Sequence, residues 1–113
     1  MSYFKDKVAI VTGSGMGIGK ATALELCAQG AKVVLNGRNP ERLEKAYAEF
    51  KEKGYDVIAV PCDITKISDC DTLINKTIEA YGKLDILITN ASVSMRESFE
   101  KLQPEVFAEI VHS

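Results

Sequence analysis

Short apolar runs alternate with longer stretches of helical periodicity along this chain, and this alternation constrains the fold more than any other feature. The runs are nearly continuous rather than alternating, which is typical of strands buried on both faces. They span 8–11, 32–35, 57–60 and 84–89, and helical patterns with one apolar face follow at 17–29, 40–53 and 69–81. The repeated strand–helix order predicts an α/β fold, with a parallel sheet covered on both sides and right-handed crossovers.

Local signals predict where two of the helices begin. Asn39 followed by Pro40 is typical of an N-cap with proline at the first helical position. Ser68 with Asp71 three residues later resembles a capping box, with Asp in place of Glu. We therefore expect helices to start at these two points.

Composition narrows the class of protein. The 113 residues are 46% apolar and carry a net charge of −2, which suits one domain with a core of its own. Neither a nucleic acid nor an anionic membrane is expected as a partner, because both call for a basic patch. No apolar run approaches the roughly 20 residues of a membrane span, and residues 1–7 have no signal-peptide core.

The cysteines indicate the compartment. Cys27, Cys62 and Cys70 are odd in number and show no CxxC spacing. One thiol would be left over in any disulfide scheme, which fits a reducing cytoplasm. A zinc site would need more ligands, and the only histidine is His112, so no metal site is predicted.

The stretch from Thr12 to Lys20, directly between the first strand and the first helix, is rich in glycine. Glycines there let the backbone turn sharply and approach a diphosphate, whose charge then lies at a helix N-terminus. The plain alternative is a tight turn that needs glycine for packing alone, but the strand before and the helix after favour a nucleotide loop. The candidate cofactor-binding residues of this loop are Gly13, Ser14, Gly15, Met16, Gly17, Ile18 and Gly19.

Counting residues separates three nucleotide motifs. The pattern GxxxxGK[ST] fails, because Ser14 and Ala21 stand where it needs Gly and Ser or Thr. The pattern GxGxxG fails from either possible start, because its last position falls on Ile18 or Lys20. The pattern TGxxxGxG fits at every fixed position.

Three motifs in order resemble those of the short-chain dehydrogenase/reductase family, over the whole chain. TGxxxGxG resembles the family's coenzyme loop, and Cys62-Asp63-Ile64 its adenine-contacting motif. Residues 82–92 resemble its fourth-strand signature, with Thr89 and Ser92 as departures. The resemblance implies a Rossmann-type doubly wound sheet, of which this chain would supply the first four strands only, in the order 3-2-1-4. It also implies coenzyme contacts from Asp63, Ile64, Asn90 and Ala91. For Asp63, a carboxylate that only caps the following turn is the alternative.

The end of the second strand predicts which dinucleotide is bound. Gly37 stands at the family's NAD-selecting acidic position and can make no contact with the ribose hydroxyls, whereas Arg38 matches the basic position of the NADP-binding subgroup. A guanidinium can fork onto a 2′-phosphate. One charge-assisted hydrogen bond contributes about 1.5–3 kcal/mol, a roughly tenfold to hundredfold preference. NADP(H) is therefore the expected cofactor and NAD(H) the weaker candidate. Otherwise Arg38 is a solvated charge at a helix start, where the helix dipole disfavours it.

No catalytic residue is predicted within the chain. The family's Ser and Tyr-x-x-x-Lys lie downstream of its fourth strand, and its catalytic Asn would fall at or just after residues 111–113. Two Tyr-x-x-x-Lys matches occur, but Tyr3 precedes the first strand and Tyr47 shares the apolar face of its helix. We expect residues 1–113 to be the NADP-binding N-terminal portion of a single Rossmann-type domain, truncated before the catalytic residues, and inactive alone.

The residues from the fourth apolar run onward are relevant to how the chain would associate with other subunits. A final helical pattern opens at Pro104 and contains Val106, Phe107, Ile110 and Val111. With four strands, 84–89 would form an uncovered apolar edge. The resemblance implies a homodimer or homotetramer in the full-length form.

The leading hypothesis is an NADP(H)-dependent oxidoreductase that acts between a small-molecule carbonyl and an alcohol. A 3-oxoacyl-carrier-protein reductase or a sugar or polyol dehydrogenase would be typical of the family. A non-catalytic NADP-binding module and a half-domain that needs a partner chain are the alternatives.

Overall fold

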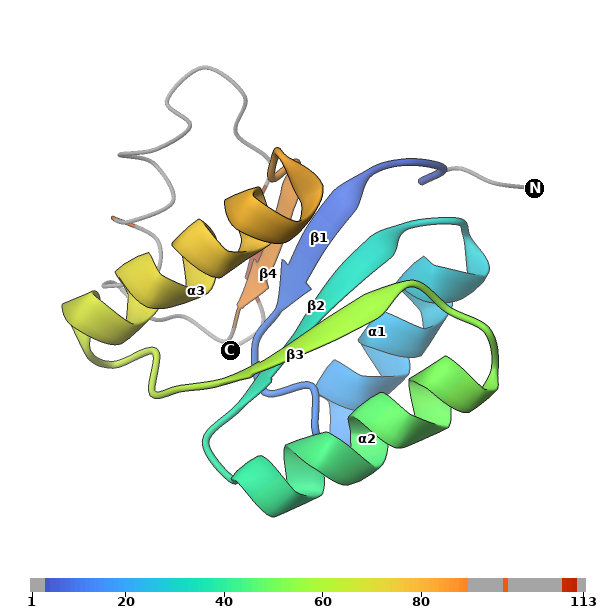
Figure 1. The fold of residues 1–113 in the computed structure, drawn as a ribbon, viewed down its shortest axis with the longest axis horizontal. Coiled ribbons are helices and arrows are strands. Elements are labelled where there is room, and N and C mark those ends of the chain that lie inside the picture. Colours follow the sequence, from blue (N-terminus) through green and yellow to red (C-terminus); the bar gives the residue numbers. More distant parts are fainter. Residues whose placement is uncertain (1–3, 90–96, 98–108, 112–113) are drawn as a thin grey trace.

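A five-stranded parallel sheet forms the centre of the molecule, with strand order β3-β2-β1-β4-β5 (Figure 1). The computed structural model describes residues 4–89, 97 and 109–111. This architecture confirms the α/β fold and the order 3-2-1-4 of the first four strands. The elements are β1 (Val8–Val11), α1 (Gly17–Ala28), β2 (Lys32–Gly37), α2 (Pro40–Glu52), β3 (Val57–Pro61), α3 (Ile67–Tyr81), β4 (Ile86–Thr89) and β5 (Glu109–Val111).

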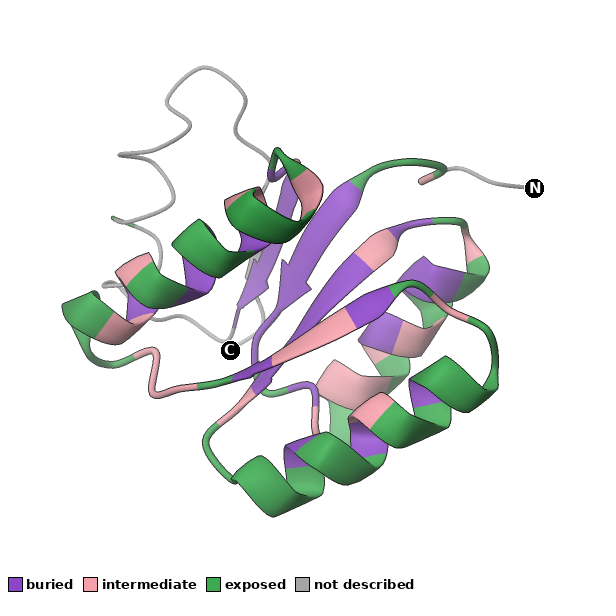
Figure 2. Ribbon diagram, viewed as in Figure 1, coloured by how far each residue is buried: buried purple, intermediate pink, exposed green. Residues whose placement is uncertain are grey.

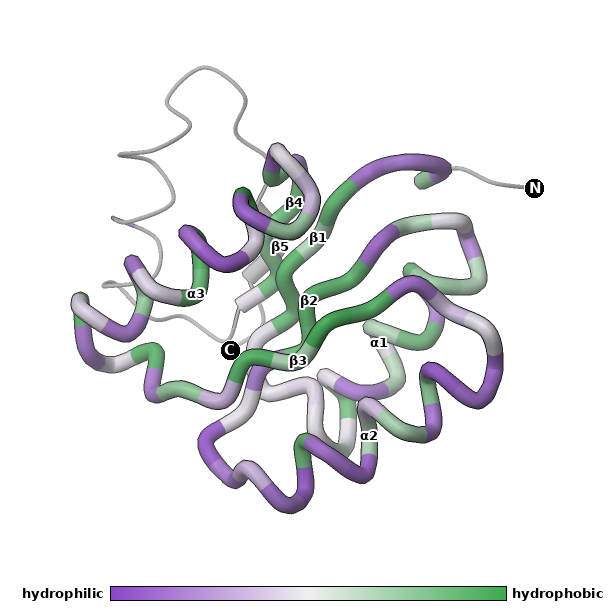
Figure 3. The backbone as a smooth tube through the Cα atoms, in the orientation of Figure 1, coloured by the Kyte–Doolittle hydropathy of each residue, from purple (hydrophilic) through white to green (hydrophobic). Residues whose placement is uncertain are grey.

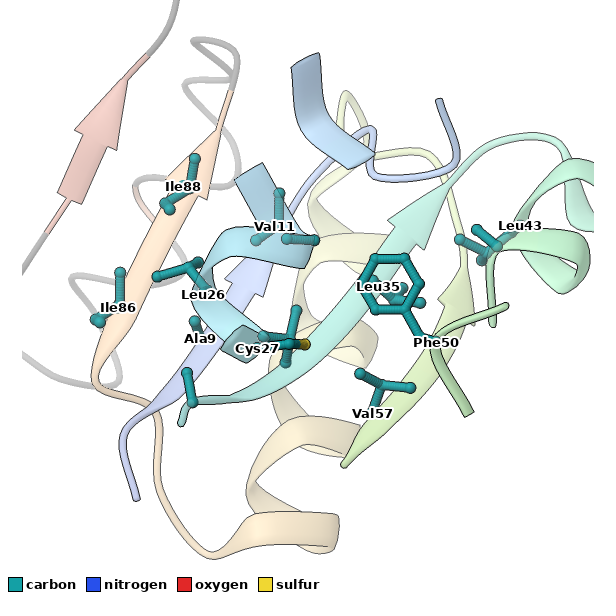
Figure 4. Close-up of a cluster of buried hydrophobic side chains, with 14 residues drawn as sticks. Ala9, Val11, Leu26, Cys27, Leu35, Leu43, Phe50, Val57, Ile86 and Ile88 are labelled. Carbon is teal, nitrogen blue, oxygen red and sulfur yellow. The ribbon is translucent and has the colours of Figure 1, made fainter. Parts of the chain in front are cut away.

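The helices cover both faces of the sheet, so β1 and β4 are buried throughout and β2 is buried at its four central residues (Figure 2). On one face, α1 and α2 pack through residues such as Leu26 and Phe50 against Val11 and Leu35 (Figure 4). On the other face, α3 packs against the intervening strand residues, of which Ile10 is fully buried. This double burial is the reason why the strand sequences are nearly continuous in apolar residues.

The helices show the opposite pattern to the strands. Along α2 and α3 the hydropathy changes from residue to residue, while the central strands stay apolar (Figure 3). The buried residues of α2 are Leu43, Ala46 and Phe50, spaced at three and four residues. This spacing places them on one side of the helix, against the sheet. Within residues 4–89 and 97, no helix is both long and apolar enough to cross a bilayer.

One of the two predicted helix starts is confirmed and the other is wrong. Asn39 is the N-cap of α2, and its side-chain Oδ1 accepts a hydrogen bond from the Arg42 N–H at 3.0 Å. The third helix does not begin with a capping box at Ser68, because α3 already starts at Ile67, after Lys66. The carboxylate of Asp69 instead accepts from the Asp63 N–H, at 2.8 Å. The start of α3 is therefore tied to the preceding loop and not to a side chain of its own cap.

The C-terminal prediction is corrected by β5. Glu109–Val111 forms a strand that pairs in parallel with β4, with Ile110 opposite Ile88. The helical pattern is therefore wrong at Ile110 and Val111, while Pro104, Val106 and Phe107 lie outside the described residues. The uncovered edge at β4 is also wrong, because the sheet does not end at four strands. Two adjacent apolar residues such as Ile110 and Val111 are compatible with the apolar spacing of a helix and with that of a buried strand. Both residues are β-branched, and β-branched residues favour strands. The unpaired backbone groups along β4 decide between the two, because a strand satisfies them and a helix does not.

Candidate functional site

The glycine loop leaves the carboxyl end of β1 and runs directly into α1. Gly13 and Gly17 have φ values of 63° and 60°, a region that L side chains rarely adopt. Gly19 lies in the first turn of α1, where a Cβ atom would stand 2.2 Å from the Gly13 carbonyl oxygen. The helix therefore approaches the loop more closely than any side chain at Gly19 would permit.

A buried polar link joins this loop to the end of β2. The Ser14 N–H donates to the Asn36 carbonyl oxygen at 2.7 Å, and the Asn36 N–H donates to the Ser14 Oγ at 2.8 Å. Both residues are buried. The hydroxyl and the amide of Ser14 thus both form hydrogen bonds within the protein, and they hold the glycine loop against the end of β2.

The side chain of Asn36 continues the link to β3. Its Nδ2 donates to the Val60 carbonyl oxygen at 3.1 Å and to the Cys62 Sγ at 3.2 Å. Asn36 thereby connects the glycine loop with the ends of two neighbouring strands. Asn36 was not predicted as a site residue, although a polar side chain at the end of an apolar strand is a signal for such a role.

The glycine loop is also attached to β4 on its other side. The Thr12 N–H donates to the Ile88 carbonyl oxygen at 3.0 Å, and the Thr12 and Thr89 hydroxyl oxygens are 3.2 Å apart. Thr89, one of the two departures from the family's signature, therefore pairs with the first residue of the loop. Asn90 and Ala91, predicted to contact the coenzyme, lie outside the described residues.

A pocket of about 310 Å³ lies between the glycine loop and the start of α2. Four of the predicted site residues line it: Gly13, Gly15, Met16 and Arg38. The rest of its lining comes from Gly37, Asn39, Arg42 and Leu43. The structure thus brings the first βα loop and the second βα loop together around one concave site, at the carboxyl edge of the sheet. Arg42, a second guanidinium at this pocket, was not predicted.

Three further predicted residues, Gly17, Ile18 and Gly19, form the first turn of α1 beside the pocket. The side chain of Ile18 is 75% exposed, although it is large and apolar. Met16 precedes the helix as its N-cap and makes no side-chain capping bond. The first amides of a helix have no partner within the helix, so this turn presents unpaired N–H groups next to an exposed apolar side chain.

Asp63 lies in the loop after β3 and performs the turn-capping role that was the alternative interpretation. Its Oδ1 accepts from the Thr65 N–H at 3.0 Å and from the Thr65 hydroxyl at 2.7 Å. These hydrogen bonds lower the pKa of Asp63, and the positive charge of Arg38 adds to the effect. The side chain of Ile64 packs against the core beneath α3.

The cysteines and Tyr47 are side chains of the types that could serve as nucleophiles, metal ligands or proton donors. The three cysteines are free, and burial raises the pKa of Cys27 to about 12 and of Cys70 to about 11, so both thiols are neutral near pH 7. The described part of the chain contains no group of three or more His, Cys, Asp or Glu side chains placed to hold a metal. Tyr47 packs against the core under α1 and α2, which confirms its structural role. Tyr3 lies outside the described residues.

Comparison with known proteins identifies the family. The model of the short chain dehydrogenase family matches residues 7–113. The chain therefore belongs to the short-chain dehydrogenase family of oxidoreductases, which use a nicotinamide cofactor. The resemblance drawn from the three motifs is thus confirmed.

Individual relatives agree with this assignment. The chain is 35% identical, over 95% of its length, to the uncharacterized oxidoreductase YxjF of Bacillus subtilis, and covers 42% of that protein. The structure of a glucose dehydrogenase of Caenorhabditis elegans superimposes with a TM-score of 0.74 at 41% identity, over 84% of this chain and 41% of that one. An NAD+-bound xylitol dehydrogenase gives a TM-score of 0.74 at 39% identity, over 79% of this chain and 34% of that one. The chain thus spans about two fifths of the length of the curated relatives it matches.

Proposed function

We propose that this chain is the NADP(H)-binding portion of a short-chain oxidoreductase that transfers hydride between the coenzyme and a carbonyl or alcohol. The observation that carries the proposal is the shared pocket of the glycine loop and the Gly37-Arg38 segment. The first turn of α1, beside the pocket, offers backbone amides, and Arg38 in the pocket offers a cation. A dinucleotide with an additional phosphate needs both.

The diphosphate would lie at the first turn of α1. The would-be Cβ of Gly19 collides with backbone, so the loop and the helix meet without intervening side chains. The amides of Gly17, Ile18 and Gly19 are the ones left without intrahelical partners, and such groups favour anions. The links from Ser14 and Thr12 hold this arrangement in place before the ligand arrives, which reduces the entropy cost of binding.

The adenosine would extend over the ends of β2 and β3. At the end of β2, Gly37 offers no carboxylate for the ribose hydroxyls, while the exposed Arg38 offers a guanidinium for a 2′-phosphate. Asp63 and Ile64 follow β3 and would contact the adenine. Because Asp63 Oδ1 is already engaged by Thr65, we assign the adenine contact to Oδ2.

The experiment that tests this proposal compares NADPH with NADH. Dissociation constants for both coenzymes should be measured on the wild type and on Arg38→Ala. We expect the wild type to bind NADPH roughly tenfold to hundredfold more tightly, from one charge-assisted hydrogen bond of about 1.5–3 kcal/mol. Arg38→Ala should remove most of this preference and leave the NADH affinity nearly unchanged. Equal affinities in the wild type would refute the NADP assignment.

The activity of the whole protein is proposed on the same basis. When bound, the nicotinamide supplies or accepts the hydride, and the chain described above binds and orients the coenzyme. We propose that the residues that exchange the substrate's proton lie outside residues 1–113, so that this segment alone binds coenzyme without turnover. A sugar or polyol is one candidate substrate, since relatives named for glucose and xylitol are among the matches, and a 3-oxoacyl carrier-protein thioester is another.

Two further proposals concern the cellular location and the oligomeric state of the protein. The three unpaired cysteines support a cytoplasmic location, where thiols stay reduced. Membership of the family supports a homodimer or homotetramer for the full-length protein.

A further inference from the structure

Arg42 lies in the first turn of α2 and reaches across the pocket toward the glycine loop. Its Cγ is the nearest atom to the position that a Cβ on Gly15 would occupy, at 3.5 Å. Its Nη1 lies 3.0 Å from the sulfur of Met16. The side chain therefore spans the distance from α2 to the loop, and Arg42 lines the pocket together with Arg38.

The guanidinium of Arg42 has no carboxylate in an ion pair among the residues that the structure describes. Within residues 4–89 and 97, neither Arg42 nor Arg38 takes part in an ion pair. Glu41, the acidic residue next to Arg42 in sequence, lines two neighbouring depressions, one shared with Arg38 and one with Arg42, but it does not line the pocket itself. In this part of the chain, the Arg42 guanidinium donates to the thioether of Met16, which is a weak acceptor. An anionic oxygen would replace the sulfur with a gain in free energy.

The position of Arg42 indicates which part of a dinucleotide it faces. Gly17 and Gly19, proposed above to hold the diphosphate, do not line this pocket, whereas Gly37 and Arg38 do. Arg42 therefore lies toward the ribose of the adenosine and not toward the diphosphate. Two guanidiniums on one pocket suit a phosphate monoester, which has up to two negative charges and three free oxygens.

We propose that Arg42 is a second determinant of coenzyme specificity, which binds the 2′-phosphate of NADP(H) together with Arg38. This inference rests on the proposed function and deepens it, because it assigns the 2′-phosphate to a pair of residues from the loop after β2 and the first turn of α2. On binding, the guanidinium leaves the sulfur of Met16 and donates its N–H groups to the phosphate.

The test uses two probes that differ only in the 2′-phosphate. Adenosine 2′,5′-bisphosphate and adenosine 5′-monophosphate should be titrated by calorimetry into the wild type, Arg42→Ala and Arg42→Lys. Lys45→Ala is the matched control, because it removes an equal charge from the next turn of α2 at a residue that does not line the pocket. Circular dichroism melts would show that each variant is folded.

We expect Arg42→Ala to reduce the preference for the bisphosphate roughly tenfold, the value of one charge-assisted hydrogen bond at an exposed site. The affinity for the monophosphate should stay within about twofold, since it has no 2′-phosphate to lose. Arg42→Lys should retain part of the preference, because a lysine keeps the charge but not the planar fork. Lys45→Ala should retain nearly all of it.

Two contrary results have different meanings. If the wild type binds both probes equally, the NADP assignment itself fails, and the role of Arg42 fails with it. If the wild type prefers the bisphosphate but Arg42→Ala keeps that preference, or weakens both probes equally, then only the inference about Arg42 is overturned.

Discussion

The close approach of α1 to the glycine loop gives a direct prediction for Gly19→Ala. The added Cβ would stand 2.2 Å from the Gly13 oxygen and 2.8 Å from its carbonyl carbon, whereas real Cβ contacts stay above 3.0 Å. Both of these atoms belong to the backbone, so the clash cannot be relieved by a change of side-chain rotamer. The first turn of α1 must move away from the loop, which is itself attached to Asn36 through Ser14.

The expected change in the free energy of unfolding is the sum of two opposing effects. Overpacking of this kind typically costs about 1–3 kcal/mol, while replacing glycine by alanine inside a helix returns up to about 1 kcal/mol. We expect the free energy of unfolding to fall by about 1–2 kcal/mol. For a domain of this size that corresponds to a decrease in Tm of roughly 5–15 °C.

The assay is thermal and urea unfolding followed by far-UV circular dichroism, with Gly15→Ala as the matched control. A Cβ on Gly15 would meet its nearest atom at 3.5 Å, an ordinary contact with the flexible side chain of Arg42. Gly15→Ala should therefore be neutral or slightly stabilising, because it restricts only the unfolded chain. If Gly19→Ala proved as stable as Gly15→Ala, the close approach described here would be incorrect.

Two further predictions concern the buried polar link and the thiols. Asn36→Ala removes the donor to the Val60 carbonyl, so we expect urea unfolding to show a loss of about 1–3 kcal/mol, whereas the exposed Asn75→Ala should change stability by less than about 0.5 kcal/mol. An equal effect of the two variants would argue against the link. Burial, followed by the charge of Asp56, raises the pKa of Cys27 from 9.0 to about 12 in the folded state. Its contribution to stability is therefore fully present below pH 9 and is lost as the pH rises toward 12. Unfolding measured from pH 8 to 11 should show a shallower decline in Cys27→Ala than in the wild type, and identical slopes would contradict this assignment.

Much of the fold could be predicted because its determinants are local. The apolar runs are long enough to specify strands buried on both faces, and Asn39 with Pro40 starts α2 where expected. The C-terminal segment could not be predicted in this way. Ile110 and Val111 do not by themselves distinguish a helix from a strand. They form a strand because they pair with the open edge of β4, which is more distant in sequence.

The residues of the candidate site also fall into those that local spacing predicts and those that it does not. Gly13, Gly17 and Gly19 could be found by counting, because their spacing reflects a turn and a helix start within one short segment. Asn36 and Arg42 could not, because each acts on the glycine loop across more than twenty residues of sequence. Their roles appear only when parallel pairing brings the ends of β1, β2 and β3 to one edge of the sheet.

The amino-acid sequence by itself determined the alternation of strands and helices, the order of the first four strands and the presence of a nucleotide-type loop. The alternation and the loop follow from periodicity and from turn chemistry, which act over short stretches of chain, and the strand order follows from the family resemblance of the three motifs. Only the tertiary structure decided the fifth strand, the polar link through Asn36 and the second guanidinium at the pocket. Each of these depends on which backbone and side-chain groups meet across the sheet, and such contacts between distant residues leave no spacing pattern in the chain.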